Sequence, residues 1–179
     1  MGWRRFLVTA VAALGLLASG AASAAADEGG TVISFQSMTP ITDGAVGAVN
    51  DRGLTAGSLP WKITSGSGTV DRDGHVSVAV TGLVLAAGPT TPPALVGKNP
   101  IGTFAAVVSC RTTAQQIVNV QTGGVPATMS GDASINTTVG LPHPCTTPEV
   151  FVGGLIRTAS GAVVFRWFAV SNGDFSDAS

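Results

Sequence analysis

Short runs of β-branched residues, broken by Gly, Pro, Asn and Asp, are the feature that most limits how this chain can fold. After residue 26 the chain is rich in Val, Thr, Ser, Gly and Ala and poor in the helix formers Leu, Glu and Lys. β-Branched side chains suit strands, and closely spaced turn residues separate the short strands of sandwiches and barrels. The pattern predicts an all-β fold: a single antiparallel β-sandwich, Ig-like or jelly-roll-like, of about nine or ten short strands.

The expected strands are separated by Pro-rich or Gly-rich connections, and the sequence has no repeat and no internal domain boundary. Residues 27–171 are therefore predicted to form one domain, followed by a loose polar tail over 172–179. Gly88–Pro100 and Gly140–Glu149 are long Pro-rich connections. The expected strands are Thr31–Gln36, Ala45–Val49, Trp61–Thr64, Thr69–Val70, His75–Leu85, Ile101–Cys110, Gln116–Gln121, Ala133–Val139, Val150–Ile156 and Ala162–Val170.

The stretch GTVDRDGHVSV has the composition of two strands joined by a turn. Val76, Val78 and Val80 alternate with polar or small residues and therefore share one face of a strand. A three-residue loop with Gly74 in the left-handed conformation sets Val70 opposite Val76. A two-residue loop would shift the register by one and place polar residues on the apolar face. The three-residue loop is therefore predicted.

The same register predicts a bend further along this hairpin. It sets Ile63 opposite Leu83 and Trp61 opposite Leu85, so the apolar residues change from even to odd positions on both strands. The change falls at Gly82 on one strand and at the SGSG stretch on the other. Glycines commonly mark such bends. We expect the two halves of the hairpin to pack on opposite faces.

The acidic residues of this turn are the weak candidates for a metal site. With Gly74 as the turn glycine of an EF-hand loop, Asp71 and Asp73 fall at ligand positions. Thr69 and Val80 then occupy the first and last positions, so the bidentate Glu is missing. The hairpin turn accounts for the same residues without a metal. No metal site and no cofactor are therefore predicted.

Residues suited to catalysis are scarce. His75 and His143 are the only histidines, and neither has a metal-ligand spacing with another. No G-x-S-x-G elbow is present. Beyond residue 26 the only glutamates are Glu28 and Glu149, which leaves few carboxylates for a hydrolytic pair. The sequence favours a non-enzymatic protein.

Trp61 and Trp167 are the only tryptophans after residue 26, and Tyr is absent. Trp167 lies in VVFRWFAV, where both strand faces are largely apolar, which predicts a central buried strand. Arg166 within that strand would need a partner, either a carboxylate or an aromatic face. Trp61 follows Pro60 near a strand start and is the better surface candidate for binding, although a core position is favoured for it too.

The N-terminus has the three regions of a secretory signal peptide: basic MGWRR, apolar FLVTAVAALGLLASG and a small-residue A-x-A segment. Residues 1–26 are predicted to be the leader, with cleavage after Ala24 or Ala26. The apolar run is short for a membrane anchor, and no later run reaches spanning length. Arg4-Arg5 leaves open whether export follows the general or the twin-arginine route. The sequence predicts a secreted, extracellular protein.

The charge of the chain limits its possible partners, and its cysteine count predicts a covalent cross-link. Without the leader, seven Lys and Arg face ten Asp and Glu, so neither a nucleic acid nor an anionic membrane surface is expected as a partner. Cys110 and Cys145 are the only cysteines, and an even count in an exported chain predicts one disulfide, free thiols being the alternative.

Five segments lie between Pro60 and Val170, a range that takes in most of the chain after the predicted leader: PWKITSGSGTVDRDGHVSVAVTGLVL, NPIGTFAAVVSC, GDASINTTVGLPHPC, PEVFV and WFAV. In them the chain resembles small secreted proteins of high-GC Gram-positive bacteria. The resemblance implies secretion, a β-rich fold and a family disulfide, and it supplies no active site. The leading hypothesis is a secreted non-enzymatic β-sandwich, structural or interacting with the cell envelope or another extracellular protein. The alternatives are a glycan-binding module using Trp61 and, more distantly, a secreted hydrolase.

Overall fold

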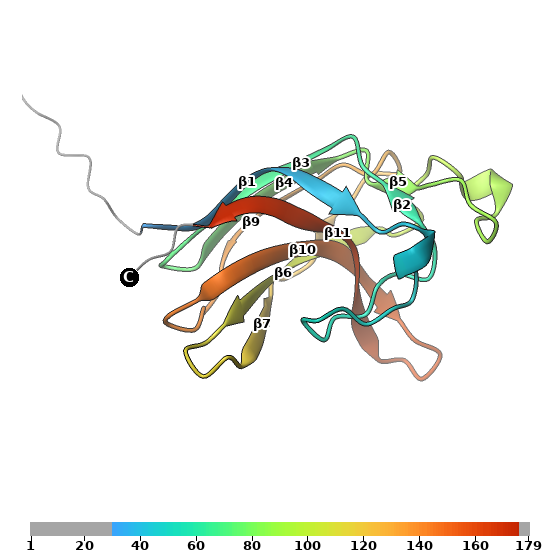
Figure 1. Cartoon of the computed structure of the whole chain (residues 1–179). Helices are drawn as coiled ribbons and strands as arrows, with labels where there is room; N and C mark the ends of the chain where they lie inside the picture. The colour runs from blue at the N-terminus through green and yellow to red at the C-terminus, as the bar shows by residue number, and fades with distance from the viewer. Residues whose placement is uncertain (1–29, 176–179) are drawn as a thin grey trace, which may run out of the picture.

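A computed structural model of the chain describes residues 30–175 and shows an all-β protein, as predicted (Figure 1). The predicted leader and residues 176–179 lie outside the described residues. Two short 3-10 helices, η1 and η2, accompany the strands, and no helix within residues 30–175 is long and apolar enough to cross a membrane. The elements are β1 (Thr31–Pro40), η1 (Asp43–Ala45), β2 (Trp61–Lys62), β3 (Ser65–Asp71), β4 (His75–Thr81), β5 (Val84–Leu85), η2 (Pro93–Leu95), β6 (Thr103–Arg111), β7 (Ile117–Gln121), β8 (Val125–Pro126), β9 (Ala133–Thr138), β10 (Thr146–Arg157) and β11 (Val163–Phe175).

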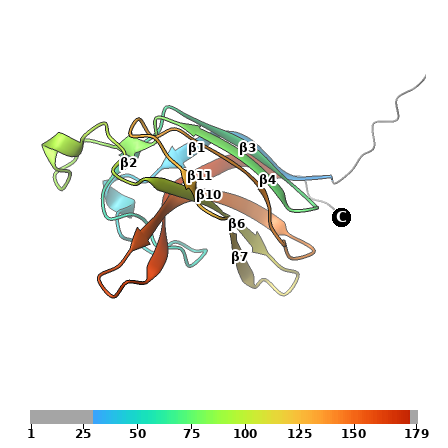
Figure 2. The same cartoon turned by 180° about the vertical axis from the view of Figure 1, so that it is seen from behind.

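Nine of the strands form one antiparallel sheet in the order β7-β6-β10-β11-β1-β3-β4-β9, with β8 paired to β6. The remaining two, β2 and β5, form a small second sheet. The large sheet curls, so that β1, β3 and β4 lie above β10, β6 and β7 in Figure 1, and Figure 2 shows the same two layers from behind. The predicted sandwich is therefore built mainly from one curled sheet, with the second sheet contributing little.

The core lies between the layers of the curled sheet. Along β4, Val76, Val78 and Val80 are buried while the intervening residues are more exposed, which is the period of two expected of a half-buried strand. From the opposite layer, Phe104 and Phe151 are almost completely buried in the same cluster. The apolar alternation in the sequence therefore fixes which strand faces point inward.

The predicted hairpin register and its bend are confirmed. Val70 pairs with Val76 and Trp61 pairs with Leu85, so the register holds along both halves of the hairpin. Gly82 adopts a positive φ of 64° at the point where β4 ends and β5 begins. Beyond the bend the alternation of β4 ends, because Leu83, Val84 and Leu85 are all buried rather than the odd positions alone.

The strand predicted over Ala45–Val49 is wrong. The segment enters through η1, in which the Ala45 amide donates to the carbonyl of Thr42 at 2.9 Å. Gly47 follows with a φ of 69°, a left-handed conformation that interrupts an extended strand. Val49 retains only an isolated bridge with Thr55. The local turn geometry overrides the β propensity of the valines.

The C-terminal strands are longer than predicted. β10 begins at Thr146 rather than Val150, because a register shift between Thr146 and Glu149 carries the pairing with β6 back toward the second cysteine. β11 continues through Phe175 and pairs there with β1, so the tail expected from residue 172 is strand as far as Phe175. The short strand β8 was not predicted.

Candidate functional site: an apolar pocket beside Trp61

A pocket of about 420 Å³ opens at the end of the molecule that carries the small β2–β5 sheet. Its walls come from the segment before β2, from β5, from the segment before β6 and from the paired strands β10 and β11. The lining residues are Gly47, Thr55, Ala56, Gly57, Ser58, Leu59, Trp61, Leu85, Pro100, Ile101, Ile156, Arg166 and Phe168. Of these thirteen, only Arg166 is charged.

Stacked aromatic rings form the floor of the pocket. The rings of Trp61 and Phe168 lie 3.9 Å apart with 11° between their planes. Phe104 packs edge-on against both, at centroid distances of 6.3 Å to Trp61 and 5.9 Å to Phe168. Edge-to-face and offset-stacked geometries are favoured between aromatic rings. The floor is therefore a rigid part of the hydrophobic core.

One wall is formed by residues 55–57, which bond to β11 beyond the point where β1 ends. β1 ends at Pro40, which pairs with Ala169. Beyond that point the Trp167 amide donates to the Thr55 carbonyl at 3.2 Å, and the Gly57 amide donates to the Trp167 carbonyl at 3.0 Å. These two bonds hold residues 55–57 beside β11, next to the aromatic floor.

Two glycines allow the walls to approach the floor. A Cβ on Gly57 would lie 3.0 Å from the Phe168 ring, and a Cβ on Gly154 would lie 2.7 Å from Cγ2 of Ile101. The contact at Gly154 is shorter than real Cβ contacts and the contact at Gly57 is tighter than most, so a larger residue at either position requires Ile101 or the Phe168 ring to shift. The shape of the pocket therefore depends on glycine at both positions.

Two polar side chains, the buried Asn99 and the more exposed Asp132, hold the backbone near the opposite wall. The Asn99 side chain accepts from the Ile101 amide at 2.9 Å and donates to the carbonyls of Ile101 and Thr128, both within 2.8 Å. Asp132 accepts from the Gly82 amide at 2.9 Å and thereby holds the bend that leads into β5. This backbone hydrogen bond, followed by the Ser130 hydroxyl, lowers the pKa of Asp132 below its ordinary value of 3.8.

Arg166 is half-buried at the pocket and forms no ion pair with the described residues. Its Nη1 donates to the carbonyl of Phe165 at 3.2 Å. The carboxylate or aromatic partner expected for Arg166 is therefore not found within residues 30–175. Gly154 lies directly across from Arg166 on β10 and offers no side chain to it.

The structure places the predicted site residues in separate locations. Trp61 is only 4 % exposed and belongs to the pocket floor, as the core interpretation expected. Asp71, Asp73 and His75 lie at the β3–β4 turn, where Oδ1 of Asp71 accepts from the His75 amide at 2.8 Å. His143 is exposed in the connection to β10. Within the part of the chain that the structure describes, no three His, Cys, Asp or Glu side chains gather as metal ligands would.

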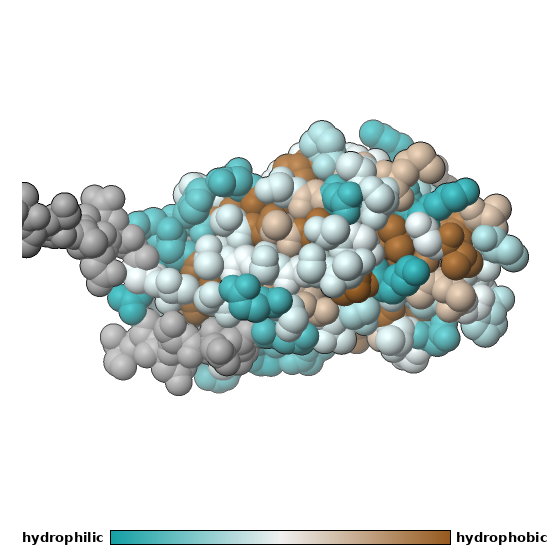
Figure 3. Space-filling view, turned by 90° about the horizontal axis from the view of Figure 1, so that it is seen from above, coloured by the Kyte–Doolittle hydropathy of each residue, from teal (hydrophilic) through white to brown (hydrophobic). Residues whose placement is uncertain are grey.

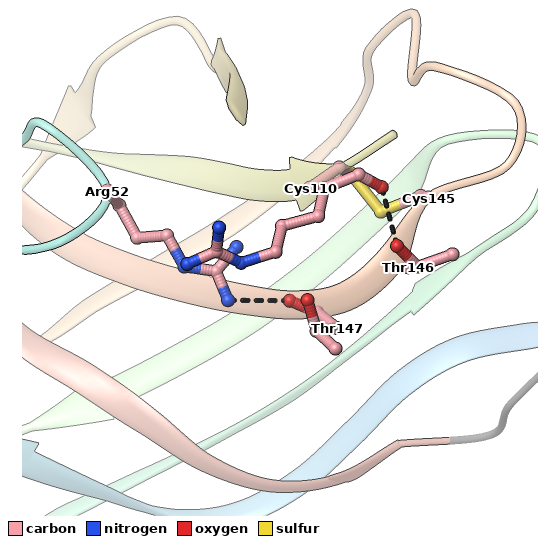
Figure 4. Close-up of a disulfide and its surroundings, with 6 residues drawn as sticks. Arg52, Cys110, Cys145, Thr146 and Thr147 are labelled. Atoms are coloured by element: carbon pink, nitrogen blue, oxygen red, sulfur yellow. Dashed lines mark hydrogen bonds between the residues drawn. A yellow bond between two sulfur atoms is a disulfide. The ribbon is translucent and has the colours of Figure 1, made fainter. Parts of the chain in front are cut away.

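The predicted disulfide between Cys110 and Cys145 is formed. It joins β6 to the residue preceding β10, and Oγ1 of Thr146 donates to the carbonyl of Arg111 beside it. Figure 4 shows the Arg52 guanidinium reaching the β10 backbone at Thr147, a hydrogen bond of 2.7 Å. The same Nη2 donates to Oε1 of Glu149 at 2.8 Å. This region is distinct from the pocket.

A second hollow, of about 210 Å³, lies on the outer face of β1, β3 and β4. It is lined by Gln36, Ser67, Gly68, Thr69, Ser77 and Ala79. Figure 3 looks onto the molecule from this side, where pale side chains of near-neutral hydropathy predominate in the middle. Since its lining has neither an aromatic nor a charged side chain, the hollow offers little to hold a ligand.

Comparison of the chain with protein-family models, with curated proteins and with solved structures found no match. The pocket therefore has to be interpreted from its own geometry. Sequence reasoning missed most of its lining, including Gly57, Ile156 and Phe168. The available signals were Trp61, named as a binding candidate, and Arg166, a charged residue in an otherwise apolar strand.

Proposed function

We propose that this protein is exported and acts outside the cytoplasm as a non-enzymatic binding module, holding an apolar small molecule of the cell envelope or the medium. The observation that carries the proposal is the pocket of about 420 Å³ with its aromatic floor. Sites for small molecules commonly measure about 300–1,000 Å³ and are mostly apolar with few polar groups. An apolar ligand would displace water from Phe168, Leu85 and Ile156.

Export is supported by the predicted leader and by the disulfide. A disulfide such as Cys110–Cys145 persists in oxidising compartments outside the cytoplasm and is rare within it. The resemblance to secreted proteins of high-GC Gram-positive bacteria points the same way. The chain can therefore meet envelope lipids and exported metabolites.

The pocket also favours one of the binding alternatives over the other. A glycan platform needs an open ring face on which a sugar can stack. Trp61 is 4 % exposed, and one of its faces is covered by Phe168 at 3.9 Å. The geometry therefore favours Trp61 as part of an apolar pocket over Trp61 as a glycan platform.

Titration of the mature chain with the neutral fluorescent probe N-phenyl-1-naphthylamine tests this function. Ser58 is exposed at the pocket, so Ser58→Trp should block the opening without disturbing the core and weaken probe binding at least about tenfold. Ser134→Trp, at an exposed position of β9 outside the lining, is the matched control and should bind normally. Absence of probe binding, or equal binding by both variants, would disprove the pocket as the site.

A further inference from the structure

The pocket combines an apolar lining with a single cation. Arg166 and Phe168 of β11 both line the pocket, and a register shift between β11 and β10 falls at Phe168, between the pairs Trp167–Gly153 and Ala169–Val152. Ile156, from β10, lines the pocket beside them. Arg166 therefore brings a cationic side chain to a lining that is otherwise uncharged.

Nothing in the described protein neutralises that guanidinium. The ion pairs within residues 30–175 involve Arg52 with Asp51 and Glu149, and Arg111 with Asp51; none includes Arg166. The lining itself contains no acidic residue. The Arg166 guanidinium makes a single hydrogen bond, to the neighbouring carbonyl of Phe165. Most of its five N–H donors are therefore free for another group.

A half-buried guanidinium beside an apolar cavity favours a ligand that carries both an anionic group and an apolar part. Arginine binds carboxylate and phosphate oxygens through paired N–H donors, and a charge-assisted hydrogen bond is roughly twice as strong as a neutral one. A neutral ligand would leave the guanidinium without a partner, and a cationic ligand would be repelled by it. The charge therefore selects among the ligands that the pocket shape admits.

We propose that the ligand is a single-chain amphiphile with an anionic head: its alkyl chain lies on the Trp61–Phe168 floor, and its carboxylate or phosphate pairs with Arg166. This inference rests on the proposed function, because it assigns the ligand class of the same pocket. It adds a head-group specificity that the pocket alone would not have.

Competition between the neutral probe and ligands of one chain length tests the proposal. Decanoate, decyl phosphate, decan-1-ol and decylamine share the same alkyl chain and differ only in the head. The mature chain should release the probe at about tenfold lower concentrations of decanoate or decyl phosphate than of decan-1-ol, and decylamine should be the weakest. Whichever of the two anions binds more tightly identifies the head group.

Arg166→Gln should remove the preference for the anions, so that decanoate, decyl phosphate and decan-1-ol release the probe at similar concentrations. Arg157→Gln is the control: Arg157 is exposed on the same hairpin, lies outside the lining, and its replacement changes the net charge equally. The preference in the wild-type chain should also shrink at high salt.

The outcomes separate the two proposals. If the wild-type chain binds decan-1-ol as tightly as decanoate, the head-group inference fails while the binding function stands. If Arg157→Gln loses the preference as fully as Arg166→Gln does, the effect is one of net charge and the inference also fails. If neither the probe nor any of the four ligands binds, both proposals fail together.

Discussion

Two arginines in this molecule lie in contrasting surroundings. Arg52, beside the disulfide, is 3 % exposed and is held by the Thr147 carbonyl and the Glu149 carboxylate. Arg166, beside the pocket, is half-buried and has no acidic partner among the described residues. In the first region the chain supplies the counter-charge itself, whereas in the second it supplies an apolar surface and no anion.

The difference suggests how to separate a structural charge from a binding charge. A guanidinium enclosed by its own protein is costly to disturb, because removing it leaves its partners unpaired in a region that excludes water. A guanidinium without a partner contributes little to folding and is available to a ligand. The disulfide region should therefore control stability, and the pocket region should control binding.

The largest expected effect comes from the disulfide. Replacing Cys110 and Cys145 together by Ala opens a loop with a sequence separation of 35 residues. In the loop-entropy account this costs roughly 3–4 kcal/mol of unfolding free energy. Urea denaturation measures the loss, and probe titration of the folded double variant should give an unchanged affinity. A changed affinity would show that the two regions are coupled.

The second-largest effect on stability is expected from Arg52→Met, which should lower the unfolding free energy by about 3 kcal/mol. The substitution leaves the Glu149 carboxylate and the Thr147 carbonyl without their donor. Urea denaturation again measures it. Adding Glu149→Gln should recover part of the loss, since the unpaired charge is then removed. A single-variant effect below about 1 kcal/mol would mean that Arg52 contributes no more than a surface ion pair does.

The pocket region should show its own pH dependence through Asp132. The pKa of this carboxyl is lowered in the folded protein, so its stabilising contribution is present above the unfolded value and is lost as the pH falls through the folded value. Unfolding midpoints at about pH 6 and about pH 3 measure the change. At the higher pH the Asp132→Asn variant should be less stable than the wild-type protein. Its unfolding midpoint should also differ less between the two pH values. An equally steep acid dependence in Asp132→Asn would assign the effect to other carboxylates.

The smallest expected effect on stability belongs to Arg166. Arg166→Met keeps the apolar contact of the stem and removes a charge that pairs with nothing in the described protein, so the unfolding free energy should change by less than about 0.5 kcal/mol. Comparison with Arg52→Met by urea denaturation is the most direct test of the contrast. A loss as large as that of Arg52→Met would show that Arg166 has a structural role.

Local patterns in the sequence were sufficient where neighbouring residues decide the structure. The alternation of Val76, Val78 and Val80, together with the turn at Gly74, specified the register of the β3–β4 hairpin. Around Gly82 the pattern of apolar residues changes from even to odd positions. This change specified the bend of the hairpin, since a strand exposes alternate residues and a one-residue shift exchanges its faces. Two cysteines in a chain with a predicted leader predicted the disulfide, which the structure contains.

Contacts between distant segments decided what the sequence pattern left open. The valines near residue 49 have strand propensity, but the Gly47 amide donates to the Gly57 carbonyl and the Ala56 amide donates to the Ala48 carbonyl, which places Gly47 in the pocket lining. Arg166 could be recognised as a charge in need of a partner, but whether a carboxylate reaches it depends on how the sheet curls.

The sequence by itself determined the all-β class, the hairpin register and the cysteine pair, because each depends on side-chain alternation, turn chemistry or residue count. Only the tertiary structure decided that one curled sheet makes both layers, that Trp61 stacks on Phe168, and that Arg166 is left without an acid beside them. A pocket consists of surfaces from segments far apart in the chain, and no local pattern encodes their meeting.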